Sequence, residues 1–253
     1  MNSQTRKERM KALRFYLKDD IRQETDFDTT DQNLGVPMPP IEKPCLPDAL
    51  RFSLPGPDAW KDMGNASVYE AIANRRSRRK FSQTPLSLEE LSFLLWTTQG
   101  VRKQKEHVTL RTVPSAGNRH ALETYVAVFR VTGLEEGIYR YLPSTHELVL
   151  ESRPDQLSAK LAEAALHQPF AGLSAATFIW TAIPYRMEWR YAEASYKVIA
   201  LDAGHVCQNL YLACESIGAG TCAIAAYHQQ AVDDLLEVDG EEEFTVYLSP
   251  VGK

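Results

Sequence analysis

Five of eight consecutive side chains are cationic in the run Asn74-Arg75-Arg76-Ser77-Arg78-Arg79-Lys80-Phe81. The chain around this run is acidic, with a formal net charge of -5 at pH 7. Guanidinium groups bind phosphate and carboxylate oxygens through a fixed fork of N–H donors. Such a concentration of arginines on an acidic protein predicts a local anionic ligand, and we expect a molecule that carries phosphate to bind here.

Helix signals stand on both sides of the cationic run. Ser67 and Glu70 have the spacing of a capping box, in which each side chain binds the backbone N–H of the other residue, and apolar residues follow at helical spacing. Ser87 and Glu90 repeat this pattern, and Gly100 is placed to end the second helix. The cationic run therefore directly follows the first of two expected helices.

The first 60 residues differ from the rest of the chain. They begin with a charged, helix-like segment at 7–23 and continue into seven prolines, at positions 37, 39, 40, 44, 47, 55 and 57. Proline fixes φ and lacks a backbone N–H, so this segment should be extended and lie across other surfaces. We interpret residues 1–60 as a proline-rich N-terminal arm and residues 61–253 as the folded domain.

Strand-like and helix-like segments alternate through the folded domain, which indicates the α+β class. Strands are expected at 124–131, 138–141, 147–150, 176–183, 222–226 and 244–251, and helices at 155–167, 203–217 and 230–236. Residues 176–183 are continuously apolar, which is typical of a central strand.

Two further segments carry specific expectations. Residues 101–113 are basic and polar, and we expect a mobile surface loop there. The helix at 203–217 is apolar on more than one face, so it must be covered either by central placement or by a second copy of the chain.

Composition and spacing exclude several classes of protein. The acidic balance argues against a nucleic-acid binder, and no apolar run approaches the roughly 20 residues of a membrane span. The polar start at 1–11 does not have the apolar centre of a secretory signal. The four cysteines show no metal-ligand spacing, so we expect a reduced, cytoplasmic protein without a metal site; they are Cys45, Cys207, Cys214 and Cys222.

The cationic run resembles the flavin mononucleotide (FMN) signature of the nitroreductase superfamily, R-x-S-x-R-x-F. The resemblance implies that Arg75, Arg76 and Ser77 hold the phosphate and ribityl oxygens of FMN. It also implies that Arg79 reaches the pyrimidine edge of the flavin, where a fixed cation stabilises the negative charge of the reduced ring. Arg78 and Lys80 alternate away from this side, and we expect them to be solvated.

A second motif is Pro114-Ser115-Ala116-Gly117-Asn118, whose residue types alone predict a turn. Its place before a strand resembles the P-S-x-x-N element of nitroreductases. The resemblance implies that Pro114, Ser115, Ala116 and Asn118 belong to the cofactor site, with Ser115 and Asn118 against the isoalloxazine. Together with residues 122–126, the motif is more narrowly similar to the branch that includes thiazole- and oxazole-forming peptide dehydrogenases.

Two segments near the C-terminus extend the resemblance. Residues 201–210 are similar to the branch's central helix, D-A-G-H followed by Q-N-L, which forms the core of a homodimer. We interpret His205 within this helix as a structural residue with its hydrogen bonds satisfied. Residues 218–227 match the segment whose backbone amides lie near flavin N5. Ala225 and Ala226 replace the family's Glu-Gly there, so only backbone roles carry over.

Two departures from the family pattern concern chemistry and phosphate binding. The peptide dehydrogenases have a Lys-Tyr pair proposed to handle the substrate proton, where this chain has Arg190 and Tyr191. Arginine stays protonated and is a poor general base, which leaves Tyr191 to donate or accept a proton. Nitroreductases often continue past the last strand with basic residues that grip the phosphate. Here Lys253 is expected to fill part of that role.

The resemblance implies an α+β nitroreductase-like fold, with an antiparallel-rich sheet flanked by helices. It also implies a homodimer that binds FMN in each of two interface clefts, with the arm wrapped around the partner subunit. The expected function is an FMN-dependent oxidoreductase that passes hydride from NAD(P)H to an electron-poor acceptor such as a nitroaromatic or quinone. Two alternatives remain open: an azoline peptide dehydrogenase and a non-catalytic flavin-binding protein.

Overall fold

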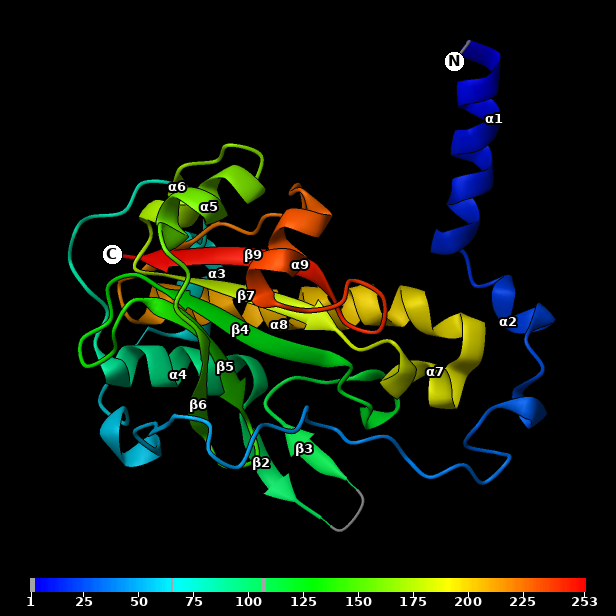
Figure 1. The fold of residues 1–253 in the computed structure, drawn as a ribbon, viewed down its shortest axis with the longest axis horizontal. Helices are drawn as coiled ribbons and strands as arrows, with labels where there is room; N and C mark the ends of the chain where they lie inside the picture. Colours follow the sequence, from blue (N-terminus) through cyan, green and yellow to red (C-terminus); the bar gives the residue numbers. More distant parts are fainter. Residues whose placement is uncertain (1–2, 65, 106–107) are drawn as a thin grey trace.

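A single large sheet forms the centre of the computed structural model, which describes residues 3–64, 66–105 and 108–253 (Figure 1). Its seven strands follow the order β1-β6-β5-β4-β7-β9-β8, and each neighbouring pair runs antiparallel. The strands are β1 (Arg51–Ser53), β4 (Leu122–Val128), β5 (Gly137–Leu142), β6 (Glu147–Ser152), β7 (Ala176–Ala182), β8 (Gly220–Thr221) and β9 (Phe244–Gly252). The expected α+β class and antiparallel sheet are confirmed.

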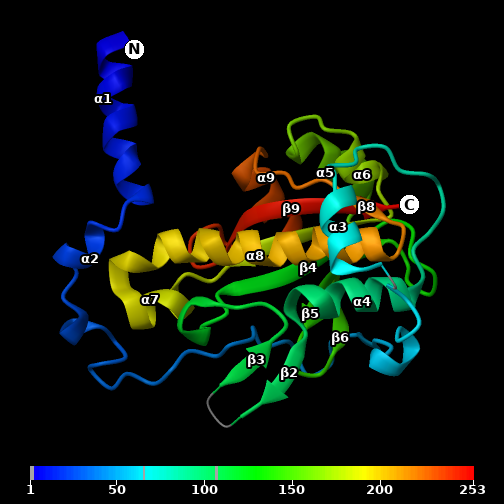
Figure 2. The same cartoon turned by 180° about the vertical axis from the view of Figure 1, so that it is seen from behind.

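Helices cover both faces of this sheet. One face carries α4 and α8, with α3 and α7 beside them, and the other carries α5, α6 and α9 (Figures 1 and 2). The helices are α3 (Val68–Asn74), α4 (Leu88–Gln99), α5 (Leu157–Ala164), α6 (Phe170–Leu173), α7 (Tyr185–Tyr191), α8 (Ser195–Ser216) and α9 (Gln229–Leu236). The sheet is therefore buried on both sides.

The central strand β7 packs against helices on both faces of the sheet. Phe178 and Trp180 point to the core under α4 and α8, whereas Ile179 between them belongs to the core under α5 and α9. Side chains alternate across a strand, so a strand between two helical layers must be apolar at every position. The central strand expected from the apolar run at 176–183 is confirmed.

Both expected capping boxes are present. The Ser67 hydroxyl accepts from the Glu70 N–H at 3.1 Å, and the Ser67 N–H donates to the Glu70 carboxylate at 2.8 Å. Ser87 and Glu90 repeat the arrangement at the start of α4. Because α3 ends at Asn74, the cationic run leaves it as extended chain, and Ser77 bridges Thr221 of β8 at the sheet edge.

The long helix α8 runs along the whole sheet (Figure 2). It begins at Ser195, eight residues before the start expected at residue 203. One of its flanks stays exposed, including Leu201, which is 53% exposed. His205 also lies exposed on α8, and its expected structural role stays a prediction.

Much of the N-terminal arm lies on the body of its own chain. Strand β1 extends the sheet at β6, and the Lys43 ammonium reaches Glu243 at 2.6 Å. The expected helix at 7–23 is broken into α1 (Ser3–Leu13), a 3-10 turn and α2 (Ile21–Glu24). Helix α1 stands clear of the body in both views (Figures 1 and 2). Wrapping of a partner subunit by the arm stays a prediction.

Two local expectations are corrected by the structure. The loop expected at 101–113 is a hairpin of β2 (Val101–Gln104) and β3 (Thr109–Arg111), with residues 106–107 outside the described part. The strand β3 does not show the apolar alternation of an ordinary buried strand, because one of its buried side chains is Arg111. The Arg111 guanidinium donates to the Gln99 amide oxygen at 3.0 Å. The strand expected at 222–226 is wrong: β8 already ends at Thr221, and residues 222–226 contain only one isolated bridge, from Ile224 to Leu248.

Several expected absences concern the described part of the chain. No helix there combines the length and apolarity that a bilayer crossing needs. Nor does any group of three or more His, Cys, Asp and Glu side chains there have an arrangement that could hold a metal ion. The four cysteines are free.

Candidate functional site

The cationic run meets α8 at a small cluster that we call the Ser77 cluster, made of Arg75, Ser77, Tyr211 and Ala223. The Ser77 hydroxyl lies 3.0 Å from the Tyr211 hydroxyl, which also accepts from the Ala223 N–H at 2.8 Å. The Arg75 guanidinium stands over the Tyr211 ring, 5.2 Å from its centroid. A hydroxyl and a guanidinium therefore lie against the same tyrosine, and both are groups that can donate to an anion.

The remaining arginines of the run have different surroundings. Arg78 forms a two-point ion pair with Glu215 of α8, one contact being 3.0 Å, so the expectation that Arg78 is solvated is wrong. Its stem packs where Gly220 has no side chain, since a β-carbon there would lie 2.5 Å from Arg78 Cδ. Arg76 and Arg79 are exposed, and the Arg79 guanidinium lies 5.9 Å from the Phe170 ring centroid.

Lys253 lies close to the Ser77 cluster in the fold but has partners of its own. Its ammonium pairs with Glu90 of α4 and donates to the Ile217 carbonyl at 3.1 Å. Its own carbonyl accepts from the Ser82 N–H at 2.6 Å. A phosphate contact by Lys253 would compete with Glu90, and this role stays a prediction.

The second motif forms a tight turn, the 114–118 turn, beside the N-terminal half of α8. The Asp202 carboxylate of α8 accepts from the Ala116 N–H at 3.2 Å, and burial raises the pKa of this carboxyl. The Ser115 hydroxyl accepts from the His120 N–H at 2.9 Å. Gly117 and Asn118 both have positive φ, at 55° and 58°. The turn is thus held by α8 on one side and by its own residues on the other.

His120 fixes the orientation of the Asn118 amide. Its Nε2 lies 3.0 Å from the Thr109 carbonyl and 3.1 Å from Asn118 Oδ1. Burial, with the nearby Arg111 guanidinium, lowers the pKa of His120 to about 3, so the ring is neutral and has one N–H. Because the Thr109 carbonyl can only accept, that N–H is on Nε2, and Asn118 must present its oxygen to it.

This orientation leaves the other end of the Asn118 amide without a partner. Asn118 Nδ2 is buried and makes no hydrogen bond to any described residue. A buried donor without a partner costs about 1–3 kcal/mol, which a ligand acceptor offsets. Flavin carries carbonyl and ring-nitrogen acceptors along its edge, so this donor fits the group that the motif implies.

The structure brings Arg190 and Tyr191 onto the 114–118 turn. A β-carbon added at Gly117 would lie 2.5 Å from the Tyr191 hydroxyl and 2.8 Å from Arg190 Cδ. The Arg190 guanidinium donates to the Gln32 amide oxygen of the arm at 3.1 Å. The two residues expected to handle a proton therefore lie beside the turn expected to contact the flavin.

The predicted site residues fall into two groups along α8. The 114–118 turn attaches at Asp202 and the Ser77 cluster at Tyr211, nine residues or about 14 Å further along the helix. Ala225 and Ala226 are exposed, and Ala225 opens into an apolar cavity of about 400 Å³ between α8 and β9. This cavity is also lined by Tyr196, Ile199, Ala200, Ala203, Gly204, Phe244, Val246 and Tyr247.

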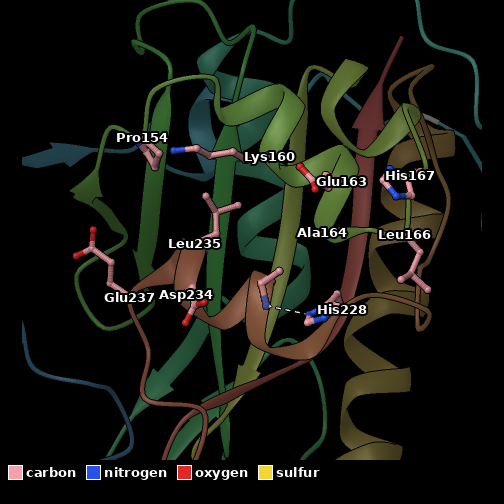
Figure 3. A pocket seen from close by; sticks show the side chains of 11 residues that line it. Pro154, Lys160, Glu163, Ala164, Leu166, His167, His228, Asp234, Leu235 and Glu237 are labelled. Atoms are coloured by element: carbon pink, nitrogen blue, oxygen red, sulfur yellow. Dashed lines mark hydrogen bonds between the residues drawn. The ribbon is translucent and has the colours of Figure 1, made fainter.

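A larger cavity of about 680 Å³ lies between α5 and α9, with Lys160 and Glu163 on one wall and Asp234 and Leu235 on the other (Figure 3). Its lining contains none of the residues expected in the cofactor site. The chemistry that the sequence predicts therefore gathers on the opposite face of the sheet, around α8.

Sequence reasoning missed Tyr211, His120 and Asp202 as members of the site. Tyr211 lies on the helix predicted at 203–217 to be apolar on more than one face, and a buried tyrosine hydroxyl usually needs a partner. That requirement is the signal that could have found it. His120 and Asp202 act through residues distant in sequence, which a motif search does not show.

Comparisons with known proteins identify the family of the chain. The profile of the Nitroreductase family matches residues 72–253. MJ1384 of Methanocaldococcus jannaschii, a protein named as a nitroreductase, is 32% identical over 206 residues, which cover 81% of this chain and 98% of that protein. A nitroreductase structure from Anabaena variabilis superposes with a TM-score of 0.70 at 25% identity, covering 84% of this chain.

The trifolitoxin-processing protein TfxB of Rhizobium leguminosarum is also similar, at 32% identity over 138 residues, which cover 53% of this chain. The chain spans less than half of two of these proteins, 37% of TfxB and 43% of the Anabaena chain. The profile match extends over most of the folded domain, and the match to MJ1384 extends over nearly the whole of that protein. The chain therefore belongs to the nitroreductase family.

Proposed function

We propose that this protein is an FMN-dependent oxidoreductase that transfers hydride from NAD(P)H to an electron-poor organic acceptor, such as a nitroaromatic or a quinone. Membership of the nitroreductase family supports this function. The observation that carries it is the buried, unpaired Nδ2 donor of Asn118, whose amide is oriented by His120 on the turn where the family motif expects a flavin contact.

Each end of the cofactor has suitable partners in this proposal. Arg75, Arg76 and Ser77 hold the phosphate and ribityl oxygens, and Lys253 joins them when it leaves Glu90. Arg79 lies at the pyrimidine edge, where its charge favours the reduced ring. The Asn118 amide, with Pro114, Ser115 and Ala116, lies against the ring. When bound, FMN supplies the two-electron chemistry by taking up hydride at N5 and giving it to the acceptor.

We also propose that the protein works as a homodimer with a flavin site in each of two interface clefts. The Ser77 cluster and the 114–118 turn attach about 14 Å apart on α8 of one chain. Large apolar side chains are exposed beside them, with Val68, Tyr69 and Ile72 of α3 between 59% and 81% exposed. An exposed apolar patch of this kind marks an association surface. The exposed flank of α8 continues it.

The segment at 223–226 completes the proposed ring site. Ala225 and Ala226 are exposed, and Ala225 lines the apolar cavity, so small side chains lie where a planar ligand would approach the backbone. A backbone N–H near flavin N5 stabilises charge that develops there during transfer. The alanines therefore replace the family's Glu-Gly without loss of the backbone role.

A second candidate function is the oxidation of an azoline in a peptide. Similarity to TfxB, a protein named for trifolitoxin processing, favours it. The Tyr191 hydroxyl beside Gly117 is the group suited to the substrate proton, since the neighbouring Arg190 stays protonated. A third reading is a flavin-binding protein without turnover.

Anaerobic addition of NADPH or NADH to the FMN-loaded protein separates these readings. The reductase proposal predicts that the flavin absorption near about 450 nm bleaches, and that a nitroaromatic or quinone then restores it. Flavin that stays oxidised with both donors, yet is reduced by an azoline peptide, would replace the reductase with the dehydrogenase. Flavin reduced by none of these would leave a binding protein.

A further inference from the structure

Tyr211 joins three parts of the proposed cofactor site through one side chain. It lies on α8, is 9% exposed, and its hydroxyl contacts both Ser77 and the Ala223 backbone. Its ring carries the Arg75 guanidinium on one face. The family motifs in the sequence contain Arg75 and Ser77 but not this residue.

The hydrogen bonds around Tyr211 have a defined direction. The Ala223 N–H can only donate, so at 2.8 Å the Tyr211 oxygen accepts from it. The Tyr211 hydrogen is then available to Ser77 Oγ, 3.0 Å away. When Ser77 accepts this hydrogen, its own hydrogen is free to point away from Tyr211, and Ser77 is exposed.

A phosphate is the ligand that this order of donors suits. Phosphate oxygens accept hydrogen bonds, so Ser77 must donate to them and needs another donor for its own oxygen. Tyr211 supplies that donor, and the Arg75 guanidinium on the Tyr211 ring adds a charge-assisted contact. The Ser77 hydroxyl and the Arg75 guanidinium therefore both depend on the Tyr211 side chain.

We propose that Tyr211 is a positioning residue for the cofactor phosphate. The Ala223 N–H donates to the Tyr211 hydroxyl, which donates to Ser77, so that Ser77 donates to the phosphate. The Tyr211 ring also positions the Arg75 guanidinium. This inference rests on the proposed function, in which Arg75 and Ser77 hold the phosphate of FMN.

Binding of FMN and of riboflavin to the Tyr211→Phe variant tests this role. Riboflavin has the same ring and ribityl chain without the phosphate, and the variant keeps the aromatic ring while removing the hydroxyl. We expect the Kd for FMN, measured by quenching of flavin fluorescence, to rise about fivefold, the usual effect of losing one hydrogen bond between neutral groups. The Kd for riboflavin should change by less than about twofold.

A matched control is Tyr139→Phe, which removes a tyrosine hydroxyl that donates to the Glu135 carbonyl at 2.9 Å in another part of the fold. It should leave both Kd values unchanged. A double-mutant cycle with Ser77→Ala adds a second readout, because Tyr211 acts through Ser77. Once Ser77 is alanine, removing the Tyr211 hydroxyl should have little further effect on FMN binding.

The outcomes separate this inference from the proposed function. An equal loss of FMN and riboflavin affinity in Tyr211→Phe would overturn the phosphate role, and so would unchanged FMN affinity or additive losses in the cycle. In each of these cases the wild-type protein still binds FMN and the proposed cofactor stands. Failure of the wild-type protein to bind either flavin would overturn both.

Discussion

His120 Nε2 lies 3.1 Å from Asn118 Oδ1, and this contact decides which end of the Asn118 amide faces a ligand. The imidazole is neutral and its one hydrogen is shared with the Thr109 carbonyl at 3.0 Å. Asn118 therefore turns its oxygen toward His120 and leaves its buried nitrogen donor without a partner among the described residues. His120, which lies outside the family motifs, thus fixes the orientation of the Asn118 amide, which lies inside one of them.

Asn118→Asp should weaken FMN binding strongly. The change keeps the shape of the side chain but replaces the Nδ2 donor with an oxygen, which repels the acceptor atoms of the flavin edge. We expect the Kd for FMN to rise by at least about tenfold, and the Kd for riboflavin to rise equally because the contact is to the ring. As a control, Asn33→Asp makes the same chemical change on the exposed arm and should leave flavin affinity unchanged. If Asn118→Asp also leaves flavin affinity unchanged, Asn118 does not contact the flavin ring.

The stability of the fold should fall with acidity through His120. Its folded pKa of about 3 lies below the ordinary value of 6.5, so below pH 6.5 the unfolded chain binds a proton that the folded one excludes. The folded state is therefore fully stable above about pH 6.5 and loses stability as pH falls toward 3. Between pH 7.5 and pH 5 we expect His120 to account for about 2 kcal/mol of lost unfolding free energy.

Urea unfolding of the wild type and of His120→Gln at both pH values measures this contribution. Glutamine has no charge to gain, so the variant should lose about 2 kcal/mol less than the wild type between the two pH values. Other buried titrating groups are common to both proteins and cancel in the difference. Equal losses in the two proteins would show that His120 is not kept neutral by the fold.

Arg75 and Arg78 should respond to alanine substitution in opposite ways, although both belong to the cationic run. Arg78 pairs with Glu215, whose side chain is 9% exposed, so Arg78→Ala leaves a mostly buried carboxylate without its partner. Because the Arg78 side chain itself is 34% exposed, we expect a modest loss of about 1–2 kcal/mol in unfolding free energy. Arg75→Ala should instead raise the Kd for FMN about tenfold or more and leave stability nearly unchanged.

Denaturant unfolding and FMN titration on the same two variants check this division of roles. The account requires that the stability effect belong to Arg78 and the affinity effect to Arg75. A loss of FMN affinity in Arg78→Ala as large as that in Arg75→Ala would mean that the whole run, ion pair included, binds the ligand directly.

Leu201→Asp should separate the proposed dimer and release flavin with it. Leu201 is 53% exposed on α8, where the proposed interface lies, and a carboxylate there would be buried without a partner in the dimer. Leu173→Asp is a matched control, because Leu173 is 56% exposed on α6, on the other face of the sheet. Sedimentation velocity should show a monomer for the first variant and a dimer for the second. A wild-type monomer that binds FMN would reject the interface site.

Local signals in the sequence predicted much of the fold. The capping boxes at Ser67 and Ser87, the apolar strand β7 and the β5–β6 hairpin each depend on residues close together in the chain. The hairpin at 101–113 escaped because β2 is polar and mostly exposed, while a charged side chain of β3 is buried by distant partners. Arg111, for example, donates to the Ile41 carbonyl of the arm at 2.9 Å.

The site was predictable in its motif residues but not in the residues that support them. The ion pair of Arg78 joins positions 137 residues apart, and the bond from Ala116 to Asp202 joins positions 86 apart. No local periodicity indicates such pairs. The motifs therefore supplied Arg75, Ser77 and Asn118 as candidates, whereas the contacts that Tyr211, His120 and Asp202 make to them emerged only from packing.

The visible absorption spectrum of the purified protein, incubated with FMN and then desalted, tests the central claim most directly. If Arg75, Ser77 and Asn118 form a flavin site, the desalted protein keeps bands near about 370 and 450 nm, and the Arg75→Ala variant loses most of them. A colourless wild-type protein after the same treatment would contradict the claim that this chain holds FMN.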